Sequence, residues 1–321
     1  MYDSMHRGGR ARRWALGLAL LAAGSGGCRR EDAELVIDPA VRLPERPAPT
    51  GSEVRFAIGT MISPRETLRM YHGLADYLGR RIGHPVTIVQ KRTYAETNDL
   101  LVRGEVDFAF VCTGAFVEVR PRGVELLVVP VVRGRRTYRS LVVVPADSPA
   151  RRVEDLRGAT VAEVDPLSLT GKLYLDALVA PLGGGAPFLG PAVMTHAHSS
   201  SIDMVAQRRA QVAAVDSLVW DDLGEREPHR VRGVRVLHRS PEFGIPPFVT
   251  RPGLPDAVKQ PLRKALLEMG QDADGARVLA ELRFDHFDLA DGAAYDTVRR
   301  LRSGAGAAAA SQRAPDVKPQ R

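Results

Sequence analysis

The sequence predicts an α/β protein with two lobes, each built on a mixed, mostly parallel β-sheet flanked by helices, and a ligand cleft between the lobes. Three observations support this prediction. Short apolar segments alternate with helical segments, this alternation restarts after Pro149, and polar residues start several of the expected helices. Strands that alternate with helices pair in parallel through right-handed crossovers. Ligands of such sheets bind at the carboxyl ends of the strands.

The first series of elements begins with an apolar strand at 54–59. Pro64 then opens a segment in which apolar residues recur at helical spacing until Gly83. Proline is typical of the first helical position and glycine of the residue after a helix. By the same criteria, further strands are expected at 86–89, 106–111, 126–132 and 140–144, and a further helix at 94–103.

The second series follows Pro149 and has the same rhythm. Its expected strands are 160–164, 191–195, 212–215, 234–237 and 248–250, and its expected helices are 153–156, 172–182, 200–209, 255–269, 274–282 and 293–301. Because each series supplies enough strands for a sheet of its own, we expect two lobes rather than one.

The composition is that of an ordinary globular protein, with 44% hydrophobic and 26% charged residues among 321. These values argue against a largely disordered chain, a collagen-like repeat and a multi-span membrane protein. The net charge of +7 lies in the chain ends: residues 1–30 and 299–321 each carry +5, which leaves −3 for residues 31–298. A nucleic-acid-binding protein needs a basic face on its folded part, so we expect no nucleic-acid partner.

Residues 1–27 have the pattern of a signal peptide, in which arginines precede a short apolar run and small residues. The apolar run is too short to span a bilayer. Two glycines before Cys28 are similar to a bacterial lipobox, although Ser25 stands where leucine is preferred. We therefore expect Cys28 to be lipidated; an ordinary cleaved signal is the alternative. The proline-rich segment 28–50 is expected to be a flexible tether, and 303–321 a disordered tail.

The sequence contains no catalytic motif of the G-x-S-x-G, HExxH or P-loop type. Its two cysteines are too few for a disulfide framework or a four-cysteine zinc site. Cys112 follows an apolar strand, where buried packing is the expected role; a catalytic nucleophile is the alternative, and it needs a nearby base. We expect no enzymatic activity, no cofactor and no metal.

Three turns from a strand to a helix carry hydroxyl groups. A helix start offers free N–H groups and a partial positive charge, so it binds an anion without lysine or arginine. The alternative is that Thr113, Ser168 and Ser200 are ordinary helix caps. The three turns lie at 111–114, 165–171 and 198–201.

Two further positions carry polar groups at strand ends. His196 and His198 have the spacing of two metal ligands on one strand face, but a single histidine that donates to an oxyanion is the favoured interpretation. Asp216 ends an apolar strand. It either accepts a hydrogen bond from a ligand amine, hydroxyl or protonated oxyanion, or caps a helix that starts near Leu218.

In order and spacing, several segments between Val54 and Met269 resemble the periplasmic phosphonate-, phosphite- and phosphate-binding proteins of ABC transporters, the PhnD-like family. This resemblance implies a type II periplasmic binding protein, whose two lobes close on the ligand by a hinge motion. The resembling segments are Leu74–Leu78, Gly104–Ala109, Tyr138–Ser140, Ala146–Pro149, Asp155–Gly158, Asp165–Gly171 and Ala213–Ser217.

The resemblance also implies site residues. The hydroxyl-rich turn of the family falls on Ser168–Thr170, its histidine on His198 and its ligand-facing aspartate on Asp216. Phe110, Cys112 and Leu169 depart from the family pattern, and Phe110 and Leu169 each remove a donor. These departures leave phosphonate, phosphite, phosphate or another small oxyanion open as the ligand. The expected ligand-binding residues are Thr113, Tyr138, Ser168, Thr170, His198, Ser199 and Asp216.

We therefore expect a monomeric solute-binding lipoprotein of an ABC importer, which captures a small oxyanion and delivers it to a membrane permease. Its lipid anchor would hold it on the periplasmic side of a bacterial membrane. The expected lobes are 51–137 with 240–302, and 138–239. The alternative function is a sensor of the same fold, whose closed form is presented to a membrane receptor or kinase.

Overall fold

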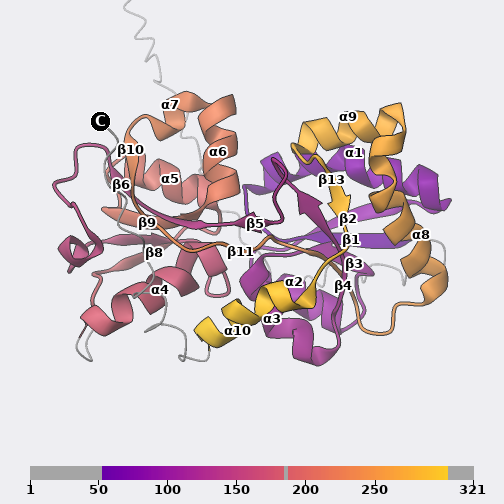
Figure 1. The fold of residues 1–321 in the computed structure, drawn as a ribbon, viewed down its shortest axis with the longest axis horizontal. Coiled ribbons are helices and arrows are strands. Elements are labelled where there is room, and N and C mark those ends of the chain that lie inside the picture. The colour runs from indigo at the N-terminus through magenta and orange to yellow at the C-terminus, as the bar shows by residue number, and fades with distance from the viewer. Residues whose placement is uncertain (1–52, 184–186, 303–321) are drawn as a thin grey trace, which may run out of the picture. The chain divides into compact units, whose positions relative to one another are not determined.

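The strands of this protein form one six-stranded, one five-stranded and one two-stranded sheet within residues 53–183 and 187–302, which the computed structural model describes (Figure 1). The predicted signal peptide, Cys28, the whole predicted tether and the predicted tail at 303–321 lie outside these residues. Within the same two ranges, no helix has the length and apolar character needed to cross a membrane.

The six-stranded sheet has the strand order β13-β4-β12-β3-β1-β2. Its strands are β1 (Val54–Ile58), β2 (Val86–Gln90), β3 (Phe108–Phe110), β4 (Glu125–Val131), β12 (Phe248–Thr250) and β13 (His286–Asp288). The accompanying helices are α1 (Pro64–Ile82), α2 (Tyr94–Val102), α3 (Thr113–Val119), α8 (Asp256–Leu267), α9 (Ala273–Leu282) and α10 (Asp296–Arg302). We call this sheet with these helices the first lobe.

The five-stranded sheet has the strand order β10-β6-β9-β7-β8. Its strands are β6 (Ser140–Pro145), β7 (Val161–Glu163), β8 (Ala192–Met194), β9 (Val212–Asp216) and β10 (Val234–Arg239). The accompanying helices are α4 (Tyr174–Val179), α5 (His198–Ala206), α6 (Ser217–Arg226) and α7 (Pro228–Val231). We call this sheet with these helices the second lobe.

The chain passes between the two sheets after β4 and again after β10. On these passages lie β5 (Thr137–Tyr138) and β11 (Phe243–Gly244), which pair with each other in antiparallel fashion. A short two-stranded ribbon therefore connects the lobes. Strands of two residues carry too little periodicity to be seen in the sequence, and neither β5 nor β11 was expected.

Both main sheets are mixed. The β1–β2, β1–β3, β7–β8 and β7–β9 pairs are parallel, as strand–helix alternation predicts. The pairs that involve β6, β10, β12 or β13 are antiparallel. These strands include those that enter a sheet directly from the connecting ribbon, without a crossover helix to reverse the chain. Five of the nine strand pairs in the two main sheets are antiparallel, so the sheets are mixed as expected, but the expectation that they are mostly parallel is wrong.

The first helix illustrates how local sequence sets an element. Ser63 caps α1 by accepting a hydrogen bond from the Glu66 N–H, and the Glu66 carboxylate accepts one from the Ser63 N–H in return. Pro64 occupies the first turn, where no N–H is needed. Gly83 ends the helix with a φ of 73°, a conformation that favours glycine.

The segment expected to be one helix at 172–182 consists of three pieces. A π-helical turn at Leu169–Leu173 precedes α4, and a short 3-10 turn follows it. Gly171 explains the irregular start, because a Cβ at this position would lie 2.5 Å from a methyl carbon of Val164. This close packing draws the turn against β7, and π-turns of this kind occur often at functional sites.

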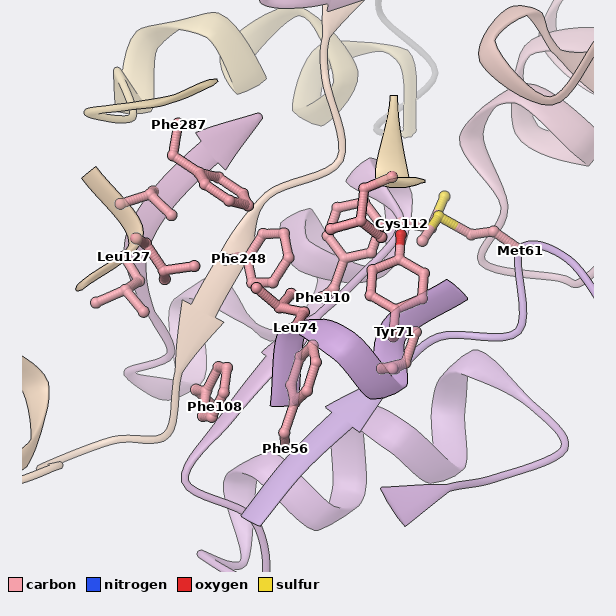
Figure 2. Packing of buried hydrophobic residues seen from close by; sticks show 14 of the residues in the cluster. Phe56, Met61, Tyr71, Leu74, Phe108, Phe110, Cys112, Leu127, Phe248 and Phe287 are labelled. Atoms are coloured by element: carbon pink, nitrogen blue, oxygen red, sulfur yellow. The ribbon is translucent and has the colours of Figure 1, made fainter. Parts of the chain in front are cut away.

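The core of the first lobe is aromatic (Figure 2). Phe56 on β1 faces Phe108 on β3, and their rings stack with centroids 4.4 Å apart. Phe110 on β3 likewise faces Phe248 on β12, with centroids 4.6 Å apart. Stacked pairs on neighbouring strands fix the register of the central strands, because a shift by one residue would turn the rings to the other face of the sheet, where Ala57 and Ala109 are packed.

Candidate ligand-binding site

The start of α3 follows β3 and differs from expectation at Thr113. Cys112 occupies the N-cap position, and Thr113 is already the first helical residue, so Thr113 is not the cap. Its hydroxyl donates to the carbonyl of Gly244 in β11, at 2.8 Å. Thr113 is fully buried. Its side chain therefore ties α3 to the connecting ribbon, and its backbone N–H is the group left for a ligand.

The turn after β7 carries two of the predicted residues. Ser168 caps the π-helical turn, since its hydroxyl accepts a hydrogen bond from the Gly171 N–H at 3.0 Å. The same hydroxyl still has a proton to donate. Thr170 is held by its carbonyl oxygen, which accepts from the Ser140 hydroxyl at 2.7 Å. The Thr170 hydroxyl is buried and has no hydrogen-bond partner among the described residues.

Helix α5 starts at His198, two residues before the expected start at Ser200, and Ala197 occupies the N-cap position. Ser200 is therefore not a cap. The His198 N–H donates to the carbonyl of Met61 in the first lobe, at 3.1 Å. The hydroxyl of Ser199 is directed at the Glu66 carboxylate, 3.5 Å away, so this side chain faces α1.

His198 is a neutral hydrogen-bond donor. Its ring is fully buried, and burial lowers its pKa to about 3. The Nδ1 atom accepts a hydrogen bond from the N–H of Asp216 at 3.1 Å, which assigns the ring proton to Nε2. Nε2 has no partner within the part of the chain that the structure describes.

The two-histidine spacing does not place its members on one strand face. β8 ends at Met194, before either histidine, and His196 has a φ of 61°, which turns the chain into α5. His198 is then the first residue of a helix. The hypothesis of two metal ligands on one strand is therefore wrong.

Asp216 is the last residue of β9 and the N-cap of α6. Its Oδ1 accepts a hydrogen bond from the Leu218 N–H at 2.7 Å, so the capping interpretation is confirmed. The carboxyl group is buried, and burial raises its pKa to about 7. Near neutral pH, Asp216 therefore holds a proton much of the time and can also act as a donor.

Sequence analysis missed Tyr94. This residue starts α2 after β2, and its N–H donates to the Asp165 carboxylate of the second lobe at 3.0 Å. Its hydroxyl is buried and without a partner among the described residues. The sequence does carry a signal for this residue, because Tyr94 stands with its hydroxyl at another turn from a strand to a helix.

Several buried polar groups lack partners among the described residues, and four of them are donors linked through Asp216: the Tyr94 and Tyr138 hydroxyls, the Thr170 hydroxyl and His198 Nε2. The Thr250 hydroxyl and His196 Nδ1 also lack partners. Burial and the charge of Asp216 raise the pKa of both tyrosines, and Asp216 also contacts His198 and lies opposite Ser140, the residue that holds Thr170. All four present N–H or O–H groups, so the region around Asp216 suits a cluster of negative oxygens.

Both lobes contribute to this region. At Gly114 in α3, a Cβ would lie 2.2 Å from the carbonyl oxygen of Leu167 and 2.9 Å from the Leu169 nitrogen. Only glycine permits this approach of α3 to the Ser168 turn.

Tyr138 and Asp216 also line a cavity of about 750 Å³, whereas the other predicted ligand-binding residues lie outside its lining. These are Thr113, Ser168, Thr170, His198 and Ser199.

A family model described as the periplasmic substrate-binding protein of phosphonate ABC transporters matches residues 56–295. Among solved structures, a binding-protein component of a phosphonate ABC transporter from Pseudomonas aeruginosa superposes with a TM-score of 0.72 at 22% identity, over 78% of this chain and 85% of that one. PhnD1 from Prochlorococcus marinus, in complex with methylphosphonate, superposes with a TM-score of 0.71 at 12% identity, over 78% of this chain and 97% of that one. A protein from Xanthomonas citri bound to ATP gives 0.63 at 24% identity, over 82% and 100%.

Proposed function

This chain belongs to the periplasmic substrate-binding proteins of phosphonate ABC transporters, and on that premise we propose that it captures a small phosphorus oxyanion between its two lobes. One observation carries the proposal: four buried donors without partners come from both lobes and the connecting ribbon, and each is linked to Asp216 or to its strand neighbour Ser140. A buried polar group without a hydrogen bond costs about 1–3 kcal/mol, and an oxyanion that accepts from all four would remove that cost.

In the proposed complex, Thr170 and His198 bind the oxyanion from the second lobe, and Tyr94 binds it from the first. Tyr138 donates from the connecting ribbon. Ser168 donates its remaining hydroxyl proton, and the amides at Thr113 and Ser199 supply helix-start donors. No lysine or arginine is needed for this arrangement, which agrees with the net charge of −3 on residues 31–298.

In this proposal, the hydrogen bond that Asp216 makes depends on the protonation state of the ligand. When protonated, its carboxyl group donates to a ligand oxygen; when ionised, it accepts from a protonated oxyanion, an amine or a hydroxyl. Because burial raises the pKa of Asp216 to about 7, the protonated form becomes more populated as the pH falls below 7. We expect a fully ionised ligand to bind more tightly at pH 6 than at pH 8.

A catalytic role for Cys112 is not part of the proposal. The thiol is fully buried, and burial raises its pKa, so the reactive thiolate is scarce at neutral pH. The family consists of transport proteins, which supports binding without chemical conversion and favours a permease over a sensor kinase as partner.

Location and assembly complete the proposal. The family is periplasmic, and we propose that lipidated Cys28 holds a monomer at the membrane by the tether. Mass spectrometry of the membrane fraction tests the anchor. The protein without substitutions should carry acyl groups at Cys28, and the Cys28→Ser variant should move to the soluble fraction. An unmodified cysteine in membrane-bound protein would contradict the anchor.

The ligand class is tested by thermal shift on the Cys28→Ser chain with methylphosphonate, phosphite, phosphate and sulfate. A ligand at 100 times its dissociation constant stabilises the folded state by about 2.7 kcal/mol. We expect a shift with at least one phosphorus oxyanion and its loss in His198→Ala. Absence of any shift at millimolar phosphorus oxyanion would refute the ligand class.

A further inference from the structure

The cavity of about 750 Å³ beside the buried donors is much larger than a phosphonate headgroup needs. Cavities of roughly 300–1,000 Å³ hold drug-sized ligands. Two residues of the proposed oxyanion site, Tyr138 and Asp216, form part of its wall, so the cavity adjoins that site. A ligand whose phosphorus group binds the buried donors would therefore direct any organic substituent into this space.

The inner wall of the cavity is apolar and partly aromatic. The first lobe supplies Met61, Tyr71 and Phe110, which lie together in Figure 2, and the ring centroids of Tyr71 and Phe110 are 5.8 Å apart. The second lobe supplies Leu218 and Val219 from the first turn of α6. Rings of this kind favour flat apolar groups, because offset and edge-on contacts add to the burial of area.

The charged groups of the wall are mostly paired with one another. Arg133 contacts Asp221 at 3.1 Å, and Arg283 contacts Asp222 at 2.9 Å. Both arginines also contact Glu225. These pairs join the first lobe to α6 across the cavity.

The arginines beside the connecting ribbon are also neutralised. Arg135 and Arg139 contact Glu242 at 3.1 and 3.0 Å. Of the arginines that line the cavity, Arg239 alone has no ion pair within the described residues, and its side chain is exposed. The cavity therefore offers few charges for a second anionic group, and its inner part suits an uncharged organic group.

From this geometry we infer that the natural ligand carries a bulky apolar organic group, preferably an aromatic ring, attached to its phosphorus oxyanion. The inference rests on the proposed function, because the buried donors must hold the phosphorus group for the ring to enter the cavity. It excludes inorganic phosphate, phosphite and methylphosphonate as the best ligands, since none of them fills the space.

Isothermal titration of the Cys28→Ser chain with phenylphosphonate, methylphosphonate and phosphate tests the inference. We expect phenylphosphonate to bind at least tenfold more tightly than methylphosphonate. Equal or weaker binding of phenylphosphonate would overturn the inference and leave the proposed function standing. Failure of all three to bind would overturn the proposed function, and the inference with it.

Two substitutions on α1 provide a matched pair. Met70 lines the cavity and is partly buried, whereas Leu68 is 48% exposed and outside the cavity. Met70→Trp should fill the space and weaken phenylphosphonate at least tenfold, with methylphosphonate changed less than threefold; Leu68→Trp should change neither. If Met70→Trp leaves phenylphosphonate unchanged, or weakens both ligands equally, the organic group does not lie in this cavity.

Circular dichroism establishes that each variant is folded. If Met70→Trp is not folded, Val219→Phe fills the same cavity from α6 and is read by the same ratio of the two affinities. An unchanged ratio in that variant would likewise overturn the inference.

Discussion

The helix starts in this protein fall into two groups. α1 and α2 begin with capping boxes, Ser63 with Glu66 and Thr93 with Glu96, in which side chains satisfy the first backbone N–H groups. α3 and α5 begin with Cys112 and Ala197 in the N-cap position, and neither makes a side-chain cap bond. All four follow strands. In α1 and α2, caps satisfy the first backbone N–H groups, whereas by our proposal the uncapped N–H groups of α3 and α5 serve ligand binding, to which α2 contributes only the Tyr94 side chain.

The largest effect is expected where an uncapped helix start meets the other lobe. Gly114→Ala places a Cβ 2.2 Å from a backbone oxygen, so α3 and the Ser168 turn must move apart. We expect a loss of about 1–3 kcal/mol of stability and loss of the ligand-induced thermal shift. Thermal denaturation with and without ligand measures both.

Gly224→Ala in α6 is the matched control, because the nearest atom to the added Cβ is a methyl carbon of Val231 on α7, 4.0 Å away. This change should leave the ligand-induced shift intact. If Gly114→Ala retained the full shift, the close approach of α3 would not matter to the site.

The next largest effect is expected when a buried tyrosine hydroxyl is removed, because ligand affinity should fall while the stability of the ligand-free protein does not. Tyr94→Phe and Tyr138→Phe each remove a hydroxyl that lacks a partner. We expect ligand affinity to fall by about 1.5–3 kcal/mol for each, the range for a hydrogen bond to a charged group, while the melting temperature without ligand stays equal or rises. Titration calorimetry and thermal denaturation make the two measurements. A drop in the ligand-free melting temperature with unchanged affinity would show that the hydroxyls are structural.

A smaller effect is expected when a cap is removed from one group of helix starts and added to the other. Ser63→Ala removes a cap and should cost about 1 kcal/mol of stability without altering affinity. Ala197→Ser adds a hydroxyl that can cap α5 and compete with the ligand for its first N–H groups, so affinity should fall while stability holds. Chemical denaturation and titration compare the two variants. The distinction between the groups fails if both substitutions change the same quantity.

The smallest effect is the pH dependence of stability in the protein without substitutions, because two buried groups contribute to it with opposite sign. Burial raises the pKa of Asp216 from 3.8 to about 7, so its contribution to stability is present at low pH and is lost as the pH rises to 7. Burial lowers the pKa of His198 from 6.5 to about 3, so its contribution is present above pH 6.5 and is lost as the pH falls. The two contributions largely cancel between about pH 4 and 6.5.

Substitution unmasks each contribution. Relative to the unmodified chain, Asp216→Asn should lose stability more steeply as the pH falls from 7 to 4.5, and His198→Asn should gain relative stability over the same range. Urea unfolding at several pH values gives the free energies. Identical slopes for all three proteins would mean that neither group is buried in the protonation state described above.

Much of the fold could be predicted from local sequence. Pro64 and Gly83 mark the ends of α1, and the apolar runs mark the longer strands, because caps and hydrophobic periodicity act within a few residues. The ribbon of β5 and β11 and the π-helical turn at Leu169 could not be predicted in this way. Each depends on a partner that is distant in the sequence or packed from another element.

The candidate site was predictable in part, for a related reason. Thr170, His198 and Asp216 stand at turns from a strand to a helix, which the sequence can locate, and Asp216 also caps α6, as one alternative held. Thr113 could not be assigned correctly, since its hydroxyl reaches Gly244 in a segment more than 100 residues away. Tyr94 stands at a strand-to-helix turn too, but only the folded structure brings Asp165 to its N–H and leaves its hydroxyl without a partner among the described residues.

By itself, the sequence determined the α/β class, the order of the elements and the turns that carry hydroxyl groups, because each depends on local propensity and on the apolar pattern. Only the tertiary structure decided which donors remain without partners. A hydroxyl or ring nitrogen becomes available to a ligand when every neighbour from both lobes has been placed and none accepts its proton. Tyr94, Tyr138, Thr170 and His198 meet that condition. The cavity beside them likewise exists only where the two lobes face each other.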